Sequence, residues 1–271
     1  MLEAIGSGTI SLAMATPSEL PSVDDFLPPE ILFQGTPFAM NRIILVRLVA
    51  MVVILLVLGI TASRAKLIPS RWQGAVEWVI EFIRDSVVYD TLGEVRGKRY
   101  VPMITTIFLT VLVFNLCGII PGMNIAATAT ITMPLVFALW TFCQYMITGI
   151  REQGFWGYFK TELFPAGVPW PLYIILTPIQ LLEMIIVKPA SLTIRLFANM
   201  VAGHLLVAVS LAFTQFYVIE ATNKLLALAG VGWFALGFAL TAFEIFVAAL
   251  QAYIFAILST VYISMSYPEE D

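Results

Sequence analysis

Charged residues are scarce in this sequence and unevenly spread. Only 12% of the 271 residues are charged, 60% are hydrophobic, and no Asp, Glu, Lys or Arg occurs from 101 to 150. A soluble domain has about a quarter charged residues, so a water-soluble fold is excluded. Uncharged apolar stretches of about 18 residues or more are typical of membrane-spanning helices, whose backbone groups bond internally. The composition therefore predicts an all-α polytopic membrane protein.

Cysteine and histidine are almost absent. Cys117 and Cys143 lie in apolar stretches with no neighbouring ligand, so neither a disulfide framework nor a metal site is expected. The chain has no glycine-rich phosphate loop, and its net charge of −4 comes mainly from acidic tails, which is not a signal for nucleic acid. The N-terminus has Glu3 but no early Lys or Arg, unlike a secretory signal. We expect no metal, no cofactor and no nucleic-acid partner.

The alternation of apolar and polar stretches predicts about five membrane helices. The expected order is a tail at 1–42, a first helix at 43–62, a loop at 63–100, a helical hairpin at 101–150, a second loop at 151–171, a long hairpin at 172–267 and an acidic tail at 268–271. Within the hairpin at 101–150, the expected spans are 102–121 and 126–150, joined by a short turn at 122–124. The two loops contain seven and two Lys or Arg residues, against only Arg42 and Lys224 on the other side. The positive-inside rule then puts the N-terminus outside and the C-terminus in the cytoplasm.

The first loop contains an amphipathic helix, expected at 70–90. Ser70 and Gln73 form a capping-box pair, and apolar residues between Trp72 and Val87 recur at helical spacing opposite the charged ones. We expect this helix to lie flat in the membrane interface on the basic side. A soluble helix packed on a partner is the alternative.

Two apolar stretches near the C-terminus, 172–219 and 225–267, are too long for one perpendicular crossing. As helices they would extend for roughly 65 to 70 Å, whereas a bilayer core is about 30 Å thick. Each stretch is therefore either two perpendicular spans or one long, steeply tilted helix. The absence of a polar turn inside either stretch favours two tilted helices that form a hairpin.

Five charged or histidine residues lie within the two apolar stretches of this hairpin: Glu183, Lys188, Arg195, His204 and Glu244. Such residues cost roughly 2.5 to 3.5 kcal/mol each on insertion scales and by default mark ion or proton pathways. Arg195 cannot lose its proton, and Glu183 is about 18 Å away along the helix, which points to a carboxylate from another subunit. His204 alone could be a packing residue, and Glu183 and Lys188 could simply snorkel or pair.

Helical spacing and hairpin symmetry organise these residues. The side chains of Ser191, Ala198 and Ala202 are small and would let a second helix approach the Arg195 face closely, so a partner helix is expected there. His204 points to the opposite side. If the turn is centred near residues 222–224, residue n faces a residue near 447 − n. This places Arg195 level with Gln251 and His204 level with Glu244, and a His/Glu pair can exchange protons near neutral pH.

Three segments resemble subunit a of F-type ATP synthases. They are Glu183 with the run Lys188-Pro-Ala-Ser-Leu-Thr-Ile-Arg-Leu-Phe-Ala-Asn-Met-Val-Ala-Gly-His204, the run Asn115-Leu-Cys-Gly-Ile-Ile-Pro121, and the run Leu250-Gln-Ala-Tyr-Ile-Phe255. The resemblance covers most of residues 65–267. The family usually has Gly where Ala198 stands, and its His/Glu pair occurs in either order.

The resemblance implies a non-catalytic stator that provides two offset half-channels to a ring of c subunits. Implied partners are the c-ring, the b subunits of the peripheral stalk, other ATP synthase subunits, lipid and protons. The implied proton-translocating residues are Arg195, His204, Glu244, Gln251, Asn199 and Glu183, and the implied ring-facing residues are Ser191, Ala198 and Ala202. The implied location is a bacterial plasma membrane, with the mitochondrial inner or thylakoid membrane as the alternative.

Two other classes are weighed against this interpretation. A secondary transporter would bind its ion between inverted repeats, and no such repeat is found. An intramembrane hydrolase would need a nucleophile beside its base, but the nearest candidate, Ser210, lies six positions after His204.

Overall fold

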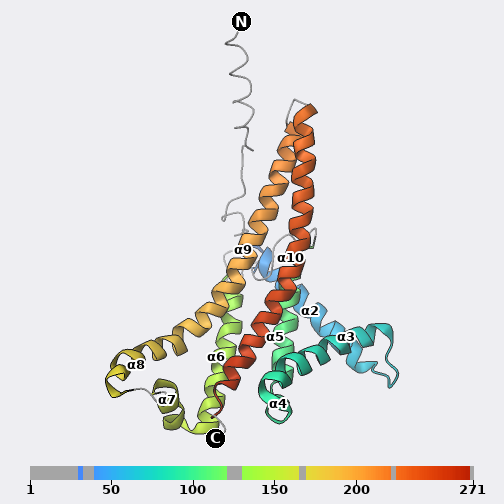
Figure 1. The fold of residues 1–271 in the computed structure, drawn as a ribbon. Coiled ribbons are helices and arrows are strands. Elements are labelled where there is room, and N and C mark those ends of the chain that lie inside the picture. Colours follow the sequence, from blue (N-terminus) through green and yellow to red (C-terminus); the bar gives the residue numbers. More distant parts are fainter. Residues whose placement is uncertain (1–29, 33–39, 121–129, 165–168, 221–223, 269–271) are drawn as a thin grey trace. The chain divides into compact units, whose positions relative to one another are not determined.

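A computed structural model describes residues 30–32, 40–120, 130–164, 169–220 and 224–268 (Figure 1). Within these residues, helices dominate, which confirms the predicted all-α class. Four helical stretches are long and apolar enough to cross a membrane: Arg42–Ser63, Thr132–Gln153, Trp170–Ile219 and Leu228–Ser264. A shorter apolar helix, Val101–Leu116, brings the total to the five expected.

The described chain forms two compact units. The larger falls within residues 29–200 and 247–271, and the described part of the smaller is residues 201–220 and 224–246. The larger unit begins with a short antiparallel pair, β1 (Glu30–Leu32) and β2 (Met40–Asn41), which the sequence analysis did not predict. Its helices are α2 (Arg42–Ser63), α3 (Arg71–Ile83), α4 (Asp90–Gly97), α5 (Val101–Leu116), α6 (Thr132–Gln153), α7 (Phe155–Leu163) and α8 (Tyr173–Leu182).

Helix α9 (Lys188–Gln215) and helix α10 (Lys224–Ser264) contribute to both units. Each is continuous, so the two C-terminal stretches are long helices rather than pairs of separate spans, as predicted. Of the expected turn at 222–224, residues 222 and 223 lie outside the described residues.

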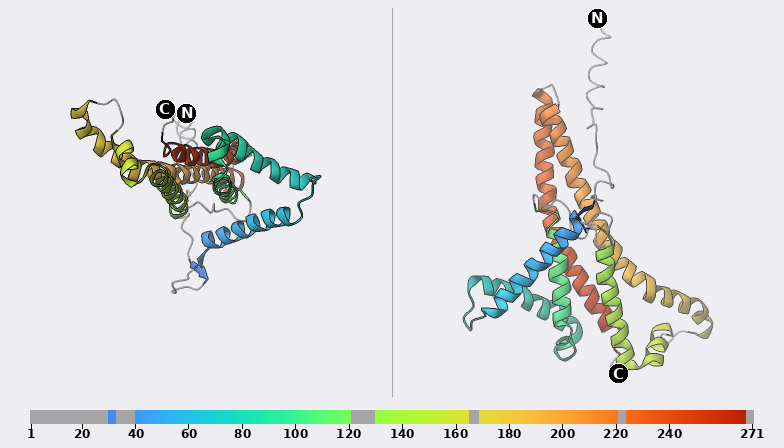
Figure 2. Two further views of the ribbon diagram at one scale, coloured as in Figure 1. Left: turned by 90° about the horizontal axis from the view of Figure 1, so that it is seen from below. Right: turned by 180° about the vertical axis from the view of Figure 1, so that it is seen from behind.

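Apolar side chains from α5, α6 and the C-terminal part of α10 meet at the core of the larger unit, to which the other helices also contribute. The ring of Phe137 contacts Phe114 on one side and Phe255 on the other, with centroid separations of 6.3 and 6.4 Å. Beside these rings, the hydroxyls of Thr141 and Ser259 lie 3.1 Å apart, fully buried. Helix α2 crosses α5 at the periphery (Figure 2). This packing fixes the part of α10 that carries Gln251.

The amphipathic segment of the first loop is helical from Arg71 onward. Ser70 caps α3 by accepting a hydrogen bond from the Gln73 N–H, as the capping-box pattern predicts. The Gln73 side chain, however, bonds to the backbone of Lys66 and to Glu77, so it closes the preceding loop. A π-helical turn, Arg84–Tyr89, continues α3 into α4.

The central hairpin differs from the predicted spans at its turn. Helix α5 ends at Leu116 and α6 begins at Thr132, whereas apolar composition alone placed these ends near residues 121 and 126. The predicted turn at residues 122–124 lies outside the described residues. Helix α7 occupies the second loop, which was expected only to be polar.

In the smaller unit, α9 and α10 are antiparallel neighbours (Figure 1). The rings of Phe213 and Trp233 stack with centroids 4.6 Å apart, and a Cβ at Gly237 would lie 2.8 Å from the Ser210 Oγ. In both pairs the residue numbers add up to within one of 447. These contacts confirm the predicted register.

Candidate functional site

The smaller unit brings together the His/Glu pair that the hairpin register placed at one level. His204 Nδ1 on α9 lies 3.3 Å from Glu244 Oε1 on α10. The side chains are only 11% and 13% exposed, so each group is largely removed from water. Burying two ionisable side chains in an apolar hairpin costs free energy. A His/Glu pair in such a place is suited to proton exchange.

Gly203 allows this contact. A Cβ at position 203 would collide with the Glu244 carboxylate, which packs directly on the α9 backbone. Small residues usually let two helix backbones approach closely in lipid. Here the space beside Gly203 is occupied by the Glu244 carboxylate instead. Gly203 was not identified from the sequence, although its position next to His204 was a usable signal.

In the larger unit, Gln251 contacts Asn199. The Asn199 Nδ2 group donates a 2.8 Å hydrogen bond to Gln251 Oε1. Gln251 is 3% exposed, and its Nε2 group has no hydrogen-bond partner among the described residues. The sequence register placed Gln251 level with Arg195, whereas the amide contact is made one helical turn later, at Asn199.

Arg195 lies on α9 in the larger unit and is partly exposed. Among the described residues, no carboxylate lies within ion-pair distance of its guanidinium. Ala198 and Ala202 on the same helix are exposed and Ser191 is partly exposed. Within the larger unit, small side chains at 191 and 198 therefore stand before and after Arg195 on α9.

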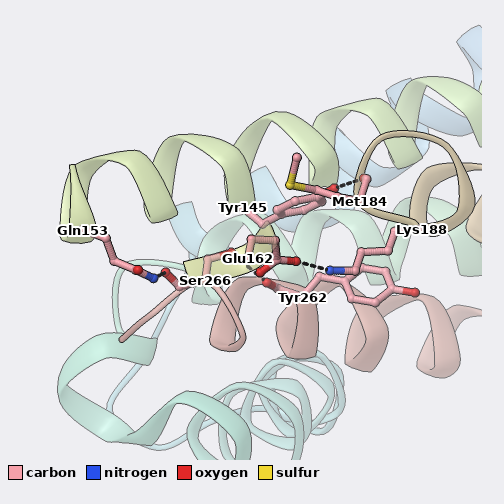
Figure 3. A network of polar contacts seen from close by, with 7 residues as sticks. All are labelled: Tyr145, Gln153, Glu162, Met184, Lys188, Tyr262 and Ser266. Carbon is pink, nitrogen blue, oxygen red and sulfur yellow. Dashed lines mark hydrogen bonds and ion pairs between the residues drawn. The ribbon is translucent and has the colours of Figure 1, made fainter. Parts of the chain in front are cut away.

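Glu183 and Lys188 line one hollow but do not form a salt bridge. The hollow has a volume of about 320 Å³ and is also bordered by Ser191 and Tyr262. The Lys188 Nζ group instead bonds to Glu162 Oε1 of α7 at 2.8 Å, with the two side chains 10% and 18% exposed (Figure 3). Pairing between Glu183 and Lys188, one of the alternatives considered from sequence, is therefore not observed, because Lys188 pairs with Glu162.

The Glu162 charge also affects a tyrosine on its own helix. Tyr158 on α7 packs its ring against Gly149 of α6 and is almost fully buried. Burial, with the negative charge of Glu162 as a smaller contribution, raises the pKa of Tyr158 to about 12. Helix α7 is therefore docked on the bundle and holds Glu162 in place for Lys188.

Metal chemistry has no support in the described part of the chain. No group of three or more His, Cys, Asp or Glu side chains there is arranged to hold a metal ion. The site residues are instead single or paired ionisable groups in an apolar environment, a pattern typical of proton conduction.

Comparison with known proteins gives one consistent result. A family model described as ATP synthase A chain matches residues 44–264. ATP synthase subunit a of Rhodococcus erythropolis is 38% identical over 91% of this chain and 89% of that protein. The subunit a proteins of Gluconacetobacter diazotrophicus and Gluconobacter oxydans are both 35% identical over 92% of this chain and 98% of their own length. The chain therefore belongs to the ATP synthase subunit a family, whose members are non-catalytic membrane subunits.

Proposed function

We propose that this chain is the stator subunit of a rotary F-type ATP synthase and carries protons to and from a ring of c subunits through two offset half-channels. Family membership supports the general role. The positions of the ionisable groups support the particular path. Each proton crossing 100 mV supplies about 2.3 kcal/mol, which the complex would convert into ring rotation.

The entry half-channel is assigned to His204 and Glu244. Their 3.3 Å contact in largely buried surroundings is the observation that carries the proposal, because two titratable groups at one level can pass a proton between them. The path then leads to a ring carboxylate, which can enter lipid only after it is protonated.

Arg195 is assigned the gate between the half-channels. Its fixed charge would favour the ionised ring carboxylate that passes it and would repel protons that take a direct route. The lack of a carboxylate partner among the described residues supports this role. Ser191, Ala198 and Ala202 would face the ring, and Asn199 with Gln251 would provide polar amide groups beside the gate.

Glu183 is assigned to the exit half-channel. It is exposed at a hollow that is large enough for several waters, and it comes before Arg195 on the basic side of the predicted topology. A carboxylate there would accept the proton released by the ring.

The predicted setting is a bacterial plasma membrane, with the N-terminus outside and the C-terminus in the cytoplasm. Beyond the c-ring, the partners would be b subunits of the peripheral stalk and, indirectly, the other subunits of the synthase. The bacterial sources of the relatives support this location.

Purification and vesicle assays test the proposal together. A tagged chain should co-purify with a c-ring and a soluble ATPase, and ATP-driven proton pumping should require Arg195, His204, Glu244 and Glu183. A chain that purifies alone and conducts ions alone would instead be a transporter and would contradict the proposal.

A further inference from the structure

The helix that carries Glu183 changes geometry at that residue. Glu183–Val187 is a π-helical turn in which the Lys188 N–H donates to the Glu183 carbonyl, five residues back. In an α-helix, residues five apart differ by about 140° around the axis. A π-turn accommodates one extra residue, so positions 183 and 188 come to the same face. This explains why Glu183 and Lys188 line one hollow.

Pro189 leaves one backbone carbonyl of this turn without its usual donor. The Met184 carbonyl would ordinarily accept from Lys188 in an α-helix or from residue 189 in a π-helix. The Lys188 N–H is already bonded to Glu183, and Pro189 has no N–H. Met184 is fully buried, so its carbonyl needs another donor.

Tyr145 of α6 supplies that donor. Its hydroxyl donates a 2.6 Å hydrogen bond to the Met184 carbonyl, and the tyrosine is 2% exposed (Figure 3). An unsatisfied buried carbonyl is costly, so this bond favours the π-turn over an α-helix in which Lys188 would bond to Met184.

Lys188 is clamped at the other end of the turn. Besides its ion pair with Glu162, its Nζ group lies 5.8 and 5.9 Å from the ring centroids of Tyr145 and Tyr262. One tyrosine therefore contacts both ends of the π-turn, through its hydroxyl at Met184 and through its ring at Lys188.

We propose that Tyr145 is a positioning residue for proton release: its hydroxyl holds the π-turn that directs Glu183 into the hollow beside Ser191. This rests on the proposed role of Glu183 in the exit half-channel. Loss of the hydroxyl lets residues 183–187 rewind toward α-helical geometry, which turns Glu183 away from Lys188 and Ser191.

The test measures direction and transport separately. A Glu183→Cys reporter is labelled with a water-soluble maleimide in membranes containing the complete synthase, with and without Tyr145→Phe. The labelling rate per molecule should fall at least fivefold with Tyr145→Phe. The control, Tyr100→Phe, removes another buried hydroxyl, bonded to Thr148 at 2.8 Å, and should leave the rate unchanged.

A second variant guards against general damage. Pro189→Ala restores an N–H that can reach the Met184 carbonyl, so adding it to Tyr145→Phe should recover most of the labelling. Proton pumping by Tyr145→Phe, with Glu183 intact, should fall about fivefold. Unchanged labelling with Tyr145→Phe would overturn the positioning role. Wild-type pumping by Glu183→Gln would instead overturn the exit-channel assignment, whatever the labelling shows.

Discussion

Glu244 reaches His204 because residue 203 is a glycine, and the carboxylate occupies the space where a Cβ would lie. Gly203→Ala should therefore push Glu244 away from the imidazole and slow proton entry. We expect ATP-driven pumping in vesicles to fall about tenfold, equivalent to about 1.4 kcal/mol on the barrier.

Gly232→Ala is the matched control for this change. A Cβ there meets nothing within 4 Å, so pumping should remain at the wild-type rate. Equal losses in both variants would mean that a general effect on the helices, rather than the His204 contact, causes the defect.

Arg195→Ala should abolish ATP synthesis while the subunit stays in the complex, because the guanidinium makes no ion pair within the described chain. Arg195→Lys should also fail, since a compact ammonium does not replace a planar guanidinium. ATP synthesis in membranes and the amount of co-purified subunit are the measurements. Synthesis at the wild-type rate in either variant would disprove the gate.

Single cysteines should map the ring-facing side of α9. Ser191→Cys, Ala198→Cys and Ala202→Cys should cross-link to a cysteine in a c subunit, because these small residues share the face of Arg195. Phe197→Cys, which lies seven residues before His204 and therefore on the same side of the helix as His204, should not. The reverse pattern would mean that the assigned face is wrong.

The ion pair between Glu162 and Lys188 should matter for stability. Glu162→Gln leaves an uncompensated buried ammonium, a change that typically costs 3 to 5 kcal/mol when a buried pair is broken. We expect a clearly lower midpoint of thermal unfolding in detergent. Adding Lys188→Met should recover most of the loss, because no buried charge then remains. If the double variant were less stable than Glu162→Gln, the burial of an unpaired Lys188 charge would not be the cause of the lost stability.

The hairpin register could be predicted from the sequence because it depends only on the extent of two apolar stretches and on the position of one turn. Long apolar stretches define two helices, and one turn position then fixes every facing pair, including His204 with Glu244. The same arithmetic placed Gln251 level with Arg195 and so missed its hydrogen bond with Asn199, one helical turn further along α9. Long side chains can reach a residue one turn away, which a register of backbone positions does not capture.

Other parts of the site could not be predicted in this way. The Glu162 partner of Lys188 lies 26 residues away on a helix, α7, that aromatic residues dock onto the bundle. The π-turn at Glu183–Val187 leaves no mark on apolar periodicity, so its effect on Glu183 became visible only with the backbone hydrogen bonds. Pro189 was the single available hint.

The most direct test of the central claim is a double-mutant cycle on His204 and Glu244, read as ATP-driven proton pumping in vesicles. If the two groups share a proton on the entry path, His204→Glu and Glu244→His should each slow pumping. The double variant, which restores the pair in swapped order, should then pump faster than either single variant. Strictly additive losses, with the double variant no better than the worse single one, would show that the residues act independently and would contradict the account.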